Sequence, residues 1–256
     1  MKKIVILLSA ALVLVSCGSM NSERLLQGGA YAAQALTLPE SQVQAYVSQY
    51  IQQLDAQSPV MGPKDPYTVR LNNLVGKLTQ VGDVPLNYKV YKNSEVNAFA
   101  CADGSVRVYT GIMDLMNDDE LLTVIGHEIG HVALKHTYVQ TRRSMLTSAA
   151  FEGLAATSDK VAALTDSQLG ALGQALIEAH FSKKQESEAD DFSYSFLVAA
   201  KRNPWTMVDA FEKLQSIDGG AVSGPVSSLF STHPDTATRI KTISKRCQED
   251  GYERGK

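Results

Sequence analysis

The sequence contains little of several residue types and features that mark particular classes of protein. Its 256 residues include only three cysteines, five histidines and one tryptophan, and the formal net charge is −3. Three cysteines are too few for a small disulfide-stapled scaffold. The mild charge lacks the basic excess of nucleic-acid-binding proteins, so no nucleic-acid partner is expected. The hydrophobic content of 44% supplies a folded core and argues against intrinsic disorder.

A long hydrophobic run, Ile4–Val15, follows Lys2 and Lys3 at the N-terminus. It is shorter than the about 20 apolar residues that a membrane-spanning helix needs. A basic start, a short apolar stretch and small residues before the cut are typical of a secretory signal peptide. We therefore expect a signal peptide over residues 1–16 and a tether over residues 17–38.

The end of this run, Leu14-Val15-Ser16-Cys17, resembles the bacterial lipobox, in which cleavage precedes a cysteine that becomes lipidated. With Gly18 rather than Asp at the next position, the resemblance implies an acylated lipoprotein at the periplasmic face of the outer membrane. The alternative is a plain cleaved signal peptide with a chance cysteine. Cys101 and Cys247 then remain as a pair in an oxidising compartment, where a disulfide and two free thiols are equally open.

Periodicity in the rest of the chain predicts a mostly helical α+β fold with a small antiparallel sheet, formed by residues 39–256 as one domain. Helical spacing predicts a helix over residues 39–57 and a second from about residue 69 to near Gly82. Residues 86–91, 96–100 and 106–109 are rich in β-formers and predict strands, with Asp103-Gly104 as a turn. From Gly111 onward the pattern is nearly all helical, and a last helix is expected over residues 235–246.

Two of the histidines lie within the motif His127-Glu128-Ile129-Gly130-His131. A helix is predicted to begin at Asn117, with Glu120 forming a capping box, so the motif lies inside this helix. Histidines at positions i and i+4 share one helical face and can bind one metal ion. Glu128 projects about 100° away from His127, where it can act as the base for a metal-bound water. The alternative is a chance match on a structural helix.

A catalytic zinc site has three protein ligands and one open position, so a third ligand is required. The acidic segment Gln185–Asp191 offers one, because helical spacing places Glu186 and Asp190 on one face. We expect Glu186 to bind zinc and Asp190 to accept a hydrogen bond from the distal nitrogen of His127. The alternative is a solvated acidic helix face.

The histidines at positions 136 and 180 are not expected to bind the metal. His136 lies five residues after His131, about 140° round a continuous helix, so it should point elsewhere. His180 has no partner at helical spacing. Both are interpreted as structural or surface residues.

These motifs resemble those of the gluzincin zinc metallopeptidases related to HtpX and the CAAX prenyl proteases. In that family the pair His127 and His131 is followed by a segment matching Glu186–Asp190, and the family pattern selects Glu186 rather than Glu188 as the ligand. The likeness covers about residues 67–246. Membrane-embedded members have several spanning helices, whereas this chain has none beyond the signal, so it resembles the soluble, lipid-anchored branch. The resemblance implies a zincin-type fold, one Zn²⁺ per chain and metalloendopeptidase activity.

Two further segments carry the same resemblance. Val96–Ala100, with Tyr109-Thr110-Gly111, resembles the edge strand that borders the active site in the family. Asn97 and Ala98 are therefore expected on an exposed edge that binds an extended substrate by strand addition. Thr232-His233-Pro234 with Arg239-Ile240 resembles the family's C-terminal His-Pro segment.

The expected chemistry assigns each of these residues a role. Zinc acidifies its bound water, Glu128 takes the proton and passes it to the leaving amine, and a nearby donor holds the developing oxyanion. His233 or Arg239 can be that donor. Alternatively, His233 can occupy the open zinc position and silence the enzyme, or it can merely cap the final helix.

The first functional hypothesis is an outer-membrane lipoprotein that cleaves unfolded or misassembled envelope proteins, with the quality-control role implied by resemblance alone. The alternative is a non-proteolytic, zinc-binding chaperone for the assembly of outer-membrane proteins. An intact Glu128 favours the enzyme, because holding zinc requires no base. A third hypothesis is a lipid-anchored scaffold that packs through the small-residue helices between Tyr138 and His180, although these helices suit a lid over the site equally well.

Overall fold

A computed structural model of the chain describes residues 38–151, 162–177, 179–218, 233 and 235–255. The expected signal peptide, Cys17 and nearly all of the tether lie outside the described residues. So does the glycine- and proline-containing stretch of residues 219–234, apart from His233.

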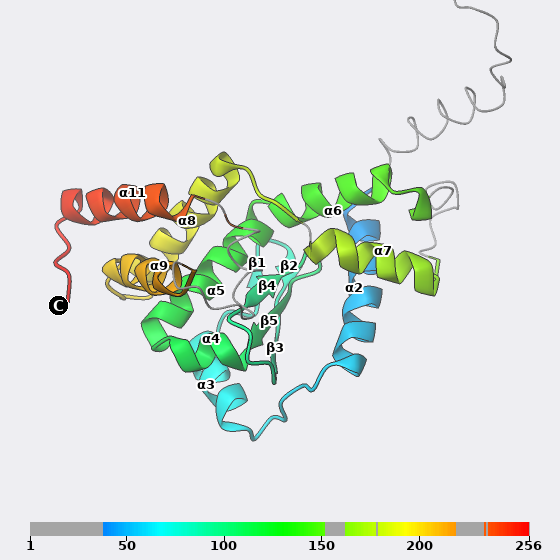
Figure 1. Ribbon diagram of the computed structural model, residues 1–256, viewed down its shortest axis with the longest axis horizontal. Coiled ribbons are helices and arrows are strands. Elements are labelled where there is room, and N and C mark those ends of the chain that lie inside the picture. Colours follow the sequence, from blue (N-terminus) through cyan, green and yellow to red (C-terminus); the bar gives the residue numbers. More distant parts are fainter. Residues whose placement is uncertain (1–37, 152–161, 178, 219–232, 234, 256) are drawn as a thin grey trace, which may run out of the picture.

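Helices make up most of the described structure (Figure 1). In chain order the elements are α2 (Glu40–Gln57), α3 (Pro66–Val75), β1 (Gln80–Val81), β2 (Val84–Pro85), β3 (Asn87–Tyr91), β4 (Ala98–Ala100), β5 (Ser105–Tyr109), α4 (Thr110–Leu115), α5 (Asp118–Ala133), α6 (His136–Thr147), the 3₁₀ turn η1 (Ala149–Phe151), α7 (Asp166–Ile177), α8 (Lys183–Ala199), α9 (Trp205–Asp218) and α11 (Thr236–Glu249). Across these residues, no helix combines the length and the apolar character that crossing a bilayer requires.

The structure confirms the mostly helical α+β class and adds detail to the predicted sheet. In the three-stranded sheet β5 lies between β3 and β4, antiparallel to β4 but parallel to β3. The short pair β1–β2 is antiparallel and was not predicted. The expected turn at Asp103-Gly104 is present, with Gly104 at φ +83°, a backbone conformation that favours glycine.

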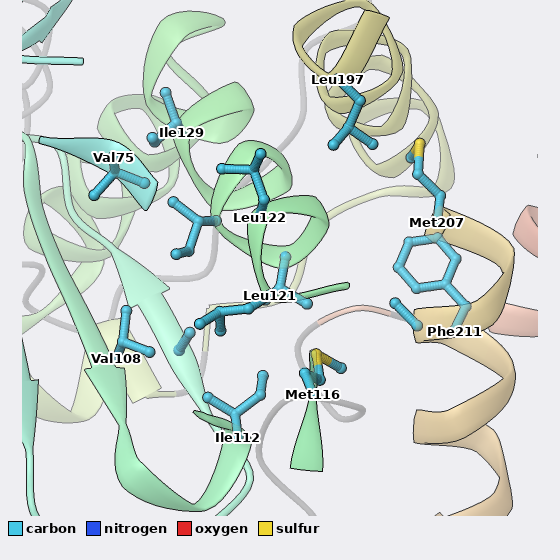
Figure 2. Close-up of a cluster of buried hydrophobic side chains, with 14 of the residues drawn as sticks. Val75, Val108, Ile112, Met116, Leu121, Leu122, Ile129, Leu197, Met207 and Phe211 are labelled. Atoms are coloured by element: carbon cyan, nitrogen blue, oxygen red, sulfur yellow. The ribbon is translucent and has the colours of Figure 1, made fainter. Parts of the chain in front are cut away.

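Helix α5 lies at the centre of the molecule, with α8, α9 and α11 to one side and α2, α6 and α7 to the other (Figure 1). Asn117 caps it through the predicted capping box with Glu120. Residues 120–132 are all buried, as expected for a helix surrounded by core on every face. Figure 2 shows Leu121 of α5 between Val108 of β5 and Phe211 of α9. The predicted metal-binding motif is therefore held in the most enclosed helix of the fold.

Two glycines of α5 allow α8 to approach closely. A Cβ atom at Gly126 would lie 2.8 Å from Cδ1 of Phe196, and one at Gly130 would lie 3.1 Å from the carbonyl oxygen of Ala189. A larger residue at either position would therefore push against α8. The glycines bring together the two helices that carry the predicted ligands.

A buried ion pair joins α2 to the sheet. Arg107 of β5 is 1% exposed and donates hydrogen bonds of 2.9 and 3.0 Å to the two carboxylate oxygens of Asp55 in α2. Lys89 and Tyr91 of β3 also donate to Asp55. Burial raises the pKa of Asp55, but the hydrogen bonds from Arg107 and its neighbours outweigh this effect and hold the pKa below its usual value.

Cys101 and Cys247 are both free thiols in the described structure, so of the two alternatives the structure shows the unpaired thiols. Each is buried in a different hydrophobic cluster. Cys101 packs with residues of α2, α6 and α7, whereas Cys247 packs in the main core with residues of α8 and α9. Each thiol is accounted for as a small apolar core group.

Candidate metal centre and active site

Three predicted ligands from two helices meet at one point. The Nε2 atoms of His127 and His131 on α5 lie 3.1 Å apart. The carboxylate oxygens of Glu186 on α8 lie 3.5 Å from His127 Nε2 and 3.4 Å from His131 Nε2. Two ligand atoms bound at about 2.1 Å to a tetrahedral zinc ion lie about 3.4 Å apart. The two imidazoles and the carboxylate therefore fit Zn²⁺ in both chemistry and spacing.

The distal nitrogen of His127 is held by a buried carboxylate, as predicted. Its Nδ1 lies 2.9 Å from Oδ1 of Asp190, and Arg239 donates hydrogen bonds of 2.6 and 2.8 Å to the two oxygens of Asp190. Arg239 Nη1 also lies 2.9 Å from a carboxylate oxygen of Glu186. Arg239 therefore contacts both of these metal-site carboxylates. Its role as an oxyanion donor stays a prediction.

These contacts set the charge states of the site. Burial and the charge of Arg239 lower the pKa of His127, but its hydrogen bonds to carboxylates outweigh both and raise it to about 9. Burial raises the pKa of Glu186, and hydrogen bonds from the histidines bring it well below the usual range. Because histidine binds a metal ion in its deprotonated form, metal binding at this site should depend on pH.

The structure corrects the predicted direction of the His136 ring, which is buried beside His131. His136 is not among the four grouped metal-ligand candidates, as expected. Helix α5 ends at Ala133, and Lys135 adopts a left-handed conformation with φ 60°. A new helix then begins at His136 and returns its ring to the metal-site side, with its Nδ1 3.1 Å from Nδ1 of His131. The prediction assumed one continuous helix. The exposed His180, in contrast, takes no part in the described site.

Phe181 also contributes to the site and was not predicted. Its ring stacks on that of His131, with centroids 3.8 Å apart and an interplanar angle of 25°. Phe181 lies between α7 and α8, and nothing in its local sequence pattern signals this contact. Burial lowers the pKa of His131 well below its usual value, so this imidazole is neutral.

The structure places His233 inside the ligand cluster. Its Nδ1 lies 3.0 Å from Oε1 of Glu186 and 3.2 Å from Nε2 of His127. One ligand atom from each of these residues and His131 lies within 4.8 Å of all the others. The residue at the helix-capping position is Asp235, so capping does not explain where the imidazole of His233 lies.

Glu128 lies at the edge of this cluster, as its predicted role requires. It is 3% exposed, and its Oε1 is 3.4 Å from Nε2 of His233. Within the described residues, this Oε1 has no hydrogen-bond partner. A buried polar atom without a partner is rare and calls for an explanation, and a catalytic role for Glu128 supplies one.

A cleft opens beside Glu128 and is bordered by the predicted edge strand. Asn97 and Ala98 line one side of it, although Ala98 is 2% exposed and so is not the exposed residue that was predicted. Strand β4 has β5 as its neighbour in the described sheet, so its opposite side is an edge. Larger side chains from α2, the sheet and the α7–α8 region complete the walls: Tyr50, Leu54, Phe99, Tyr109, Leu176 and Phe181. The cleft thus joins a strand edge to the candidate base.

Comparison with known proteins agrees with this geometry. Residues 68–247 match the model of Peptidase family M48. The chain is 39% identical to Metalloprotease LoiP of Escherichia coli (strain K12), over 98% of each chain. It is 36% identical to Metalloprotease YcaL of the same strain, over 96% of each chain. The Beta-barrel assembly-enhancing protease of that strain is 27% identical over 78% of this chain and 42% of its own length.

These matches confirm the resemblance carried by the motifs. The motifs together with the lipobox-like sequence predict a protease similar to LoiP, and the match over nearly the whole chain agrees. The family implies zinc, and the buried cluster of His127, His131, Glu186 and His233 can bind a metal ion. The chain belongs to peptidase family M48, the zinc metallopeptidases.

Proposed function

We propose that this zinc metallopeptidase is anchored by lipid to the outer membrane. It acts there as an endopeptidase that cleaves internal peptide bonds of extended or misfolded envelope proteins. The observation that carries the proposal is the strand edge of β4 in the same cleft as Glu128. An unpaired edge binds main chain rather than particular side chains, so it suits unfolded segments of many proteins. The name of one relative, the Beta-barrel assembly-enhancing protease of Escherichia coli, supports an envelope substrate.

The residues of the chain divide the chemistry among them. When bound, Zn²⁺ supplies a water of lowered pKa and polarises the scissile carbonyl. The β4 edge orients the peptide, and Glu128 takes the proton from the attacking water and delivers it to the leaving amine. Asp190 and Arg239 keep the His127 ring oriented, with its Nε2 towards the ligand cluster.

The experiment that tests this proposal combines metal analysis with cleavage assays. We expect about one zinc per chain and cleavage of casein that stops with a chelator and returns with added zinc. Reduced, carboxymethylated α-lactalbumin should be cut, whereas the native, disulfide-bonded form should resist because its backbone cannot pair with β4. Equal cleavage of both forms would contradict the proposed substrate class.

The anchor can be tested at Cys17. We expect the full-length protein made in a bacterium to incorporate labelled palmitate and to sediment with outer membranes. The Cys17→Ala variant should incorporate no label and should be recovered in the soluble envelope fraction, because one anchored cysteine is the attachment point. Label on the Cys17→Ala protein would show that acylation occurs elsewhere.

His233 is expected to restrain the enzyme in the arrangement seen here. A catalytic zinc site keeps one position for water, and His233 brings a fourth protein donor to the same cluster. We expect His233→Ala to raise the rate of casein cleavage at equal zinc content. A lower rate would instead identify this imidazole as an oxyanion donor.

A further inference from the structure

His131, the second predicted histidine ligand, is connected to the protein surface through the side chains of His136 and Glu188. Nδ1 of His131 lies 3.1 Å from Nδ1 of His136, and Nε2 of His136 lies 3.2 Å from Oε2 of Glu188. His131 is fully buried and His136 is 7% exposed, whereas the side chain of Glu188 is 41% exposed. The chain of contacts therefore runs from the centre of the metal site out to solvent.

The two nitrogen contacts allow one assignment of protons when Nε2 of His131 binds a metal. That nitrogen then presents its lone pair, so the proton of the neutral ring is on Nδ1. This N–H faces Nδ1 of His136, which must accept. The proton of His136 is therefore on Nε2, where it is donated to the carboxylate of Glu188.

We propose that His136 is a positioning residue for His131, and that Glu188 fixes the tautomer in which His136 can accept. The interruption between helices α5 and α6 at Lys135 brings Nδ1 of His136 next to His131. The stacked ring of Phe181 covers the face of His131, so the hydrogen bond and the stacking together fix the imidazole plane. Glu188 lies between Glu186 and Asp190 in the sequence and binds no metal in the predicted site. In this proposal its role is to accept the hydrogen bond from His136.

The two histidine ligands are supported differently. His127 contacts a carboxylate directly, and this carboxylate is buried and neutralised by Arg239. His131 reaches its carboxylate through a second imidazole, and Glu188 pairs at the surface with Lys184 at 3.6 Å. Partners of this kind orient a ligand and raise its basicity, and their loss weakens metal binding by roughly 10–100-fold.

The inference rests on the proposed zinc site and is tested by zinc affinity, measured in competition with a chromophoric chelator. His136→Leu fills the space but offers no acceptor, so the Nδ1–H of His131 is left buried and unpaired. We expect its dissociation constant for zinc to rise by about 10–100-fold. His136→Asn places an amide oxygen near the former Nδ1, and we expect it to restore most of the lost affinity.

A matched control makes the same chemical change outside the chain of contacts. His180→Leu alters an exposed histidine next to Phe181, and we expect zinc affinity equal to wild type. Circular dichroism of the zinc-free proteins checks that all variants fold. A merely structural role for His136 would leave the Asn variant as weak as the Leu variant, and that result would overturn the inference.

Wild-type protein provides a second measurement that needs no variant of His136. Long-range ¹H–¹⁵N spectra of the zinc-bound enzyme report which imidazole nitrogen carries the proton. We expect the proton on Nδ1 of His131 and on Nε2 of His136. A proton on Nδ1 of His136 would contradict the inference, whereas wild-type protein that binds no zinc would instead refute the proposed function.

Discussion

Replacing Glu128 by Gln is expected to lower kcat for casein cleavage by about 10³-fold, because general acid–base catalysis contributes roughly 10²–10⁴-fold. The amide has the shape of the carboxylate but cannot take a proton from the attacking water. Zinc content should be unchanged, because Glu128 is not one of the three predicted ligands. The measurement is initial cleavage rate at saturating casein, with zinc determined on the same samples.

The same variant separates the two functional hypotheses. A non-proteolytic chaperone would keep its cellular function in Glu128→Gln, whereas a protease would lose it. Glu249→Gln is a matched control, because this side chain is 63% exposed in a surface pair with Lys245. Cleavage by Glu128→Gln at the wild-type rate would show that the proposed base is wrong.

Of the substitutions proposed for this chain, Asp55→Asn is expected to lower the free energy of unfolding the most. It leaves the buried guanidinium of Arg107 without its charge partner, and breaking a buried pair in this way costs about 3–5 kcal/mol. For a chain of this size, we expect Tm to fall by roughly 6–20 °C. Asp209→Asn removes one of the two exposed carboxylate partners of Arg254, the other being Glu212, and it should cost less than about 1 kcal/mol.

The effect of Asp55→Asn should depend on pH. The folded-state pKa of Asp55 lies below that of the unfolded chain, so its ionised form stabilises the fold. This contribution is complete above the unfolded pKa of about 3.9 and disappears as pH falls through the lower folded value. Chemical denaturation at pH 7 and at successively lower pH should show the two proteins converging. A constant difference across this range would contradict the assignment.

Local patterns predicted the parts of the site that lie within regular helices. His127, Glu128 and His131 follow from the spacing within one helix, and Glu186 with Asp190 from the spacing within another. The capping box at Asn117 and Glu120 was predicted for the same reason. Each of these predictions depended only on the constant angle of about 100° between successive residues of an α-helix, which holds as long as the helix continues.

The predicted direction of the His136 ring was wrong because α5 does not continue to that residue. No proline or glycine marks the end of α5, and Lys135 adopts a positive φ that lysine rarely takes. Tertiary packing therefore decides where the chain turns. The parallel pairing of β3 with β5 was likewise invisible, because alternation of side chains shows a strand but not its neighbour.

The two glycines of α5 bear on any attempt to graft this site into another scaffold. Each of the two histidines predicted to bind the metal directly follows one of them, at Gly126 and Gly130. Copying the histidines and the glutamates into a helix with alanines at these places would move the partner helix outward and separate the donor atoms. A design must therefore reproduce the close spacing of the two helices, which depends on the absence of side chains at Gly126 and Gly130.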